Sequence, residues 1–229
     1  MQANEIGGYA RYAVYWAPSP GSGLAEAGAA WLGYDPATGL GDPSRASDPR
    51  VTAPRRYGLH ATLKPPFRLA PGATVEALDA AVSTLATRRA PATAPGLAVD
   101  PGLGFLALRP ADPCPAIDAL AAEAVMSLDG FRAPLTDEDR ARRGADSLAP
   151  DARERLERWG YPHVLEAFRF HITLTGRLAS DEAEATATEL RARFAPHLGG
   201  AFAVDALAIF GDPGNGTGFR LLRHYPLTG

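Results

Sequence analysis

Two short stretches of the chain share the pattern His-x-Thr-Leu, one at His60 and one at His171. An imidazole has an ordinary pKa of about 6.5, so it can take up or release a proton near neutral pH. Two imidazoles at one substrate can act as general base and general acid, which suits the hydrolysis of a phosphodiester. Thr62 and Thr173 follow each histidine by two residues. Their hydroxyls can donate hydrogen bonds to phosphoryl oxygens on which negative charge develops.

We therefore predict that His60 and His171 are catalytic and that Thr62 and Thr173 bind the substrate. This scheme needs no metal and no other cofactor. A single histidine on a strand is more often structural, but two copies of one tetrapeptide pattern favour a functional pair. A metal site fits poorly, because neither stretch has a second His, Cys or carboxylate beside its histidine on the same face.

The residues around each histidine indicate how it is positioned. Apolar side chains alternate with His60, Thr62 and Lys64 in the range 57–64, and the same alternation surrounds His171 in the range 168–175. Successive side chains of a strand point to opposite faces. Each stretch is thus predicted to be a strand with one face in the core and one face carrying histidine and threonine. Two such strands could line one groove.

Lys64 is the only lysine in the chain and shares the expected groove face with Thr62. We predict that it binds an anionic group of the substrate. The alternative is a lysine in solvent at the end of a strand.

The order of elements suggests a duplication, because strand, helix, His-x-Thr strand, helix and strand occur twice. The sequence predicts an α+β fold with two pseudo-symmetric lobes, each an antiparallel sheet with outer helices, around a central cleft. We expect one bilobal domain over residues 1–229. The strands are expected at 9–16, 92–99, 103–108, 202–210 and 219–225 besides the two motifs, and the helices at 24–32, 74–88, 117–128 and 181–194, with Ser22, Thr74 and Ser180 as caps of three of them.

A charged segment interrupts the second half at about 131–166 and is predicted to hold two short helices. It is either a solvated surface or a lid that selects substrates above the cleft. Arg11 and Tyr15 share a parity on the first strand, but the apolar residues around them leave the direction of that face open. His163, His197 and His224 are expected at the surface.

The composition sets limits on partners. The 229 residues are 46% apolar and 21% charged, with a formal net charge of −3, as in an ordinary globular protein. An extended nucleic-acid partner would call for a basic surface, so none is expected. No segment reaches the roughly 20 apolar residues of a membrane span, and residues 1–8 do not have the pattern of a signal peptide. With the single Cys114 precluding an internal disulfide, a cytoplasmic location is expected. The oligomeric state stays open.

Several stretches beyond the two motifs resemble one family. They are residues 11–18, 28–33, 57–67, 131–136, 158–162 and 168–178. The chain resembles the 2H phosphoesterase superfamily, and most closely a branch of it named for phosphonate metabolism. The resemblance implies a two-lobed fold with the active cleft between the lobes. It also implies that His60 and His171 are the catalytic pair and that Thr62 and Thr173 bind phosphate.

The function expected from the residues and the resemblance is metal-independent hydrolysis of a small phosphorylated substrate. The substrate class is a cyclic phosphodiester of ribose or of a nucleotide, with a phosphoribosyl cyclic phosphate as the choice that fits phosphonate metabolism. One alternative is an RNA-end processing enzyme. Another is a non-catalytic module that binds phosphate esters, although binding alone would not need both an acid and a base.

Overall fold

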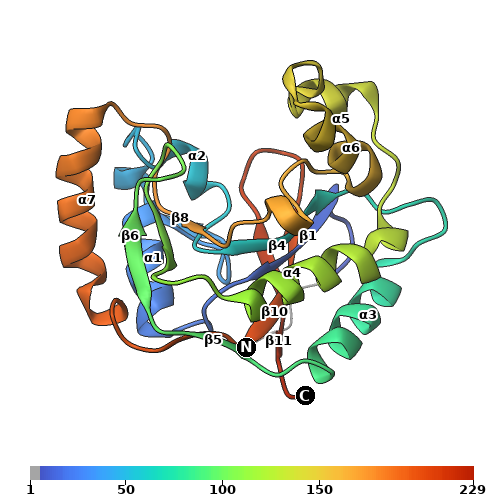
Figure 1. Ribbon diagram of the computed structural model, residues 1–229, viewed down its shortest axis with the longest axis horizontal. Coiled ribbons are helices and arrows are strands. Elements are labelled where there is room, and N and C mark those ends of the chain that lie inside the picture. Colours follow the sequence, from blue (N-terminus) through green and yellow to red (C-terminus); the bar gives the residue numbers. More distant parts are fainter. Residues whose placement is uncertain (1–5) are drawn as a thin grey trace.

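The structure is a computed structural model and describes residues 6–229 (Figure 1). The expectation of no signal peptide at residues 1–8 therefore falls mostly outside the described residues. The strands are β1 (Arg11–Trp16), β2 (Tyr34–Asp35), β3 (Leu40–Gly41), β4 (Ala61–Phe67), β5 (Ala92–Ala94), β6 (Leu97–Asp100), β7 (Ala107–Pro110), β8 (Ile172–Thr173), β9 (Phe202–Val204), β10 (Ala206–Asp212) and β11 (Arg220–Pro226). The helices are α1 (Gly23–Leu32), α2 (Thr52–Arg55), α3 (Val75–Thr87), α4 (Pro115–Ser127), α5 (Asp137–Arg142), α6 (Pro150–Trp159) and α7 (Ser180–Phe194), with 3-10 turns at Pro43–Arg45, Asp129–Phe131, Ala145–Ser147, Leu165–Ala167 and Ala195–His197.

A mixed α/β fold is built on one seven-stranded antiparallel sheet with the order β11-β10-β1-β4-β8-β7-β6. The sequence predicts a separate sheet for each half of the chain, and here the structure differs. Strands β10 and β11 from the second half pair beside β1, whereas β6 and β7 from the first half pair beside β8. The two His-x-Thr segments are consequently next to each other at the centre of a single sheet.

The sequence of β1 does not reveal which of its two faces turns to the cleft, and the structure shows why. Tyr12, Val14 and Trp16 belong to the main apolar core, whereas Ala13 and Tyr15 belong to a second, smaller core on the opposite face. Both faces are buried, so every residue from 12 to 16 can be apolar. A strand buried on both sides carries no polar residues that would reveal which face is which.

The helices begin largely where their capping residues predict. The Ser22 hydroxyl accepts a hydrogen bond from the Ala25 amide at 3.3 Å, and the Thr74 hydroxyl accepts one from the Ala77 amide at 3.2 Å. The predicted cap at Ser180 is wrong, because Ser180 is already the first residue of α7. Three of the helices pack against the sheet. Helix α4 packs against β4, α3 packs against β10 and β11, and α7 packs against β6 and also against α1 (Figure 1).

The segment 131–166 contains the two predicted short helices, α5 and α6, which lie together at the top right of Figure 1. Arg140 joins them through an ion pair with Glu157 at 2.9 Å. Arg68, which follows β4, donates to Asp139 of α5 at 2.8 Å. The insertion is therefore fastened to the strand that carries the first motif. Among residues 6–229, no helix combines the length and the apolar character needed to cross a bilayer.

Candidate active site

The two motifs meet because β4 and β8 pair directly, with Ala61 opposite Ile172. His60 and His171 directly precede these two strands, and Thr62 and Thr173 lie within them. All four side chains line one cavity of about 370 Å³, which we call the histidine cleft. The apolar residues between them point the other way and are buried in the main core. The structure places these four polar side chains in one groove, as the sequence predicts.

A β-bulge in β4 changes the direction of the residues after Thr62. Tyr15 of β1 is opposite Thr62, but its neighbour Val14 is opposite Lys64, so Leu63 is an extra residue on β4. A bulge of this kind places consecutive side chains on the same side and shifts the alternation by one. Lys64 was expected on the groove face because it follows Thr62 by two residues. The bulge turns it to the opposite face of the sheet.

Lys64 is 1% exposed and does not line the histidine cleft. Its ammonium donates to the Val125 carbonyl at 3.0 Å and to the Asp129 carboxylate at 3.2 Å, both on the side of α4. Burial lowers the pKa of Lys64 to about 8, against the opposing effect of Asp129. The prediction that Lys64 binds substrate is wrong, and Pro65 lines the cleft in its place.

The His60 ring is held in one orientation and one tautomer. Its Nδ1 lies 3.0 Å from the Gly58 carbonyl oxygen, which can only accept, so Nδ1 carries the proton and Nε2 is left as the basic nitrogen. Nε2 is 3.5 Å from the Thr62 hydroxyl. The rings of Tyr15 and Tyr57 lie 4.2 and 5.5 Å from the imidazole, centre to centre. This burial lowers the pKa of His60 to about 4.

His171 repeats the arrangement. Its Nδ1 donates to the Arg169 carbonyl at 2.7 Å, so its Nε2 is likewise the nitrogen left free. Phe105 lies 5.7 Å from the ring, centre to centre. Burial lowers the pKa of His171, and the positive charges of Arg109 and His163 lower it further. In the unliganded cleft both imidazoles thus favour the neutral form, and both hold Nδ1 on the carbonyl two residues earlier in the chain.

The second motif was predicted as a strand over 168–175, but only Ile172 and Thr173 pair as β8. The residues that follow are held by hydrogen bonds outside regular strand pairing, from backbone amides and from one side chain. The Leu106 carbonyl accepts from the amides of Leu174 at 2.9 Å and Thr175 at 3.2 Å. The buried Thr175 hydroxyl accepts from the Leu106 amide at 3.0 Å and donates to the Gly176 carbonyl at 2.8 Å.

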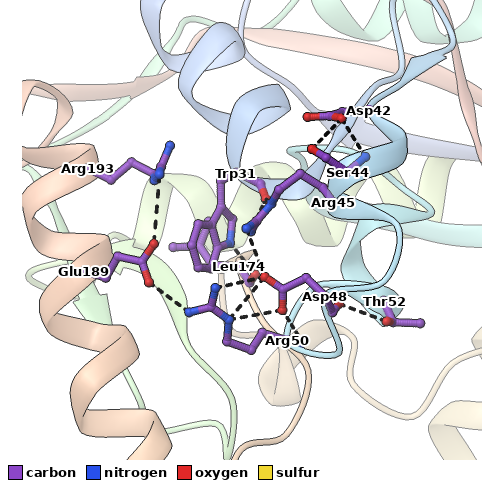
Figure 2. Close-up of polar contacts among 10 residues, drawn as sticks. All are labelled: Trp31, Asp42, Ser44, Arg45, Asp48, Arg50, Thr52, Leu174, Glu189 and Arg193. Atoms are coloured by element: carbon purple, nitrogen blue, oxygen red, sulfur yellow. Dashed lines mark hydrogen bonds and ion pairs between the residues drawn. The ribbon is translucent and has the colours of Figure 1, made fainter.

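Trp31 of α1 holds the same segment from the other side (Figure 2). Its fully buried indole donates from Nε1 to the Leu174 carbonyl at 2.7 Å. The Arg50 carbonyl accepts from the Gly176 amide at 2.7 Å. Arg45 donates to the Trp31 carbonyl at 2.8 and 3.0 Å. Helix α1 and the loop before α2 therefore fix the backbone directly after Thr173.

Arginines enclose the Trp31 indole. The guanidinium carbons of Arg45, Arg50 and Arg193 lie 4.8, 5.0 and 5.6 Å from its ring. Asp48 pairs with Arg45 at 3.0 Å and with Arg50 at 2.9 Å, and Glu189 pairs with Arg50 at 2.8 Å (Figure 2). Carboxylates neutralise these cations, so we assign the cluster a supporting role for β8.

Sequence reasoning missed most of the other residues that line the histidine cleft. Two of them had a signal: Thr175 shares its parity with His171 and Thr173, and Tyr15 shares its parity with Arg11. The structure turns Tyr15 to the cleft, while Arg11 pairs with the buried Asp212 at 2.5 Å. The exposed His163 lines an adjoining cavity of about 460 Å³ that shares His171 and Thr62. The additional cleft residues with polar or aromatic side chains are Tyr57, Phe105, Arg143, Tyr161, Thr175 and Arg177.

Within residues 6–229, no three His, Cys, Asp or Glu side chains are gathered in a way that could hold a metal ion. The cleft itself offers two imidazoles, hydroxyls and two guanidinium groups. Such a set can exchange protons and bind an anion.

Comparison with known proteins places the chain in a family. Residues 62–220, which include both threonines and His171, match the family described as "Protein of unknown function (DUF1045)". The chain belongs to the DUF1045 family. Two curated relatives of this DUF1045 protein are both described as ribose 1,5-bisphosphate phosphokinase PhnN. The one from Laribacter hongkongensis (strain HLHK9) is 41% identical over 93% of this chain, and the one from Janthinobacterium sp. (strain Marseille) is 34% identical over 96%.

The DUF1045 protein spans 51% of the length of each curated relative that it matches. Among solved structures, the crystal structure of LigT from E. coli complexed with NADP+ is similar over 97% of this chain and all of that chain, with a TM-score of 0.42 and 16% identity.

Proposed function

We propose that this DUF1045 protein is a phosphodiesterase that hydrolyses a small, cyclic phosphodiester by general acid–base catalysis, with His60 and His171 as the catalytic pair. The observation that carries the proposal is the matched orientation of the two imidazoles. Each donates Nδ1–H to a backbone carbonyl, and both rings line one cleft together with Thr62 and Thr173. The two-lobed arrangement of the 2H phosphoesterases is part of this proposal.

In the proposed reaction, His60 is the base because its burial favours the neutral ring. Its Nε2 takes a proton from water as the water oxygen bonds to phosphorus. His171, protonated, gives its Nε2 proton to the ring oxygen as the phosphorus–oxygen bond breaks, so that one water is added across that bond. Thr62 and Thr173 donate hydrogen bonds to the non-bridging oxygens, where the negative charge of the transition state gathers. None of these steps requires a metal ion.

The proposed substrate is a ribose-based or nucleotide cyclic phosphate. The cleft volume of about 370 Å³ lies in the range of small-molecule sites. The curated relatives, of twice this length, bear names that refer to ribose 1,5-bisphosphate. A phosphoribosyl cyclic phosphate, whose ring opening leaves a phosphorylated ribose, is the substrate that joins these observations. A role in phosphonate catabolism belongs to the same proposal.

The test is hydrolysis of a nucleoside 2′,3′-cyclic phosphate, followed by phosphorus NMR, with enzyme treated exhaustively with EDTA. We expect ring opening to a phosphate monoester at an undiminished rate. His60→Asn and His171→Asn should each abolish most of it, whereas His197→Asn, outside the cleft, serves as the matched control. Activity that disappears with EDTA and returns with a divalent metal would contradict the mechanism.

A further inference from the structure

The histidine cleft is cationic in a protein whose formal net charge is −3. Its lining includes Arg143 and Arg177 besides the two histidines, and it contains no Asp or Glu. The adjoining cavity, which shares Arg177 and His171, also has no carboxylate in its lining. A local positive site of this kind attracts anions.

Arg143, which directly follows α5, differs from the two arginines of that helix. Arg140 and Arg142 of α5 form ion pairs with Glu157 and Asp139. Arg143, the next residue, turns toward the cleft, where its guanidinium carbon lies 4.6 Å from the Tyr161 ring centre. Over residues 6–229, its guanidinium forms no hydrogen bond and no ion pair. It is a half-buried cation without a carboxylate to neutralise it.

The surroundings of Arg143 oppose its charge. Burial lowers the pKa of Arg143, and the neighbouring charges of Arg142 and Arg11 lower it as well. Placing a cation in a partly desolvated site costs free energy unless an anion compensates it. Tyr161 and Tyr57 act in the opposite direction. A negatively charged ligand would compensate this charge.

Arg143 reaches the cleft from a different part of the chain than the groups assigned to the reacting phosphoryl group. His60, Thr62, His171 and Thr173 lie in β4 and β8 or directly before them. Arg143 comes from the insertion 131–166, where it lies against Tyr161. With the two imidazoles and the two threonines assigned to the phosphodiester, this guanidinium is available for another anionic group.

We propose that Arg143 binds a second anionic group of the substrate, a phosphate monoester, and thereby selects cyclic phosphodiesters that carry one. This inference rests on the proposed function and adds the residue that recognises the second phosphate of the substrate. A guanidinium can bind a phosphate through two parallel hydrogen bonds, and stacking on Tyr161 fixes the plane in which it presents them. The insertion then acts as the part of the protein that chooses the substrate.

The experiment compares two substrates, adenosine 2′,3′-cyclic phosphate with and without a 5′-phosphate, and measures the ratio of their kcat/KM values. The wild-type enzyme should favour the compound with the 5′-phosphate. Arg143→Gln should lower this ratio by about 10- to 100-fold, the loss expected for a charge-assisted hydrogen bond, mainly through KM. Arg143→Lys should retain part of the preference for the 5′-phosphate, because it keeps the positive charge but not the paired donors of the guanidinium.

Arg142→Gln is the matched control, since its side chain pairs with Asp139 and is not part of the cleft lining. It should leave the ratio unchanged. A wild-type ratio near one, or a ratio preserved in a folded Arg143→Gln protein, would overturn the inference while leaving the phosphodiesterase intact. If neither compound is hydrolysed, the proposed function fails instead. Calorimetric binding of ribose 5-phosphate then decides the role of Arg143, and equal affinity of wild type and Arg143→Gln would refute it.

Discussion

At the scale of single residues, two backbone carbonyls determine what the histidines can do. Because Gly58 and Arg169 accept the Nδ1 protons, both rings present Nε2 as the exchanging nitrogen. The same burial that fixes the rings also favours their neutral forms. A bound phosphodiester anion would oppose this effect, because a nearby negative charge raises the pKa of a histidine.

This balance predicts the pH dependence. The base must be neutral, so kcat/KM should fall as the pH drops through the His60 pKa of about 4. The acid must be protonated, so kcat/KM should fall again as the pH rises through the pKa of His171, which lies below its ordinary value. The maximum of kcat/KM is expected below about pH 6.5. For kcat, the bound anion should move the alkaline limb to higher pH. A maximum of kcat/KM well above neutral pH would contradict the assigned roles.

Lys64 provides a second prediction for a single residue. Because it is 1% exposed and bonded to Val125 and Asp129, Lys64→Ala should destabilise the fold rather than weaken substrate binding. We expect a loss of about 2–4 kcal/mol in the free energy of unfolding, as for truncation of a large buried side chain. Asp129 keeps its ion pair with Arg132 at 2.8 Å, which limits the loss. Urea denaturation and KM for the cyclic phosphate, measured on the same protein, check this. A raised KM at unchanged stability would restore Lys64 to the binding site.

At the scale of elements, β8 is too short to hold Thr173 by strand pairing, so α1 must contribute. Trp31→Phe keeps an aromatic ring in the core but leaves the Leu174 carbonyl without its indole donor. An unsatisfied buried carbonyl costs about 1–3 kcal/mol, and unfolding should show this loss. Hydrogen exchange should quicken at the amides of Leu174 and Thr175. Unchanged exchange there would mean that Trp31 does not fix the segment.

The elements also show which parts of the fold can be predicted from the sequence. Alternation at 57–64 and the caps at Ser22 and Thr74 are local signals. The structure has both helices, but the strand β4 begins at Ala61 rather than at residue 57 and continues to Phe67. The bulge at Leu63 is not local, because it exists only in the pairing of β4 with β1. The short β8 escaped prediction for a similar reason. Its neighbours Leu174 and Thr175 bond to Leu106 and Trp31, which are distant in sequence.

At the scale of the whole molecule, the two motifs meet because strands of the two halves are exchanged. Strands β10 and β11 complete the side of β1, and β6 and β7 complete the side of β8. A repeated order of elements predicts that two similar units exist, but not which strands each unit recruits. For the same reason the sequence could not place the insertion, which brings Arg143 and Tyr161 to the cleft from far along the chain.

The most direct test of the central claim is the kinetics of His60→Ala, His171→Ala and the double variant on one cyclic phosphodiester, with folding checked by circular dichroism. Each single replacement removes one proton transfer and should lower kcat by about 10²- to 10⁴-fold. The double variant should lose far less than the product of the two losses, because both groups serve one transition state. A well-folded single variant with kcat near that of the wild type would contradict the account.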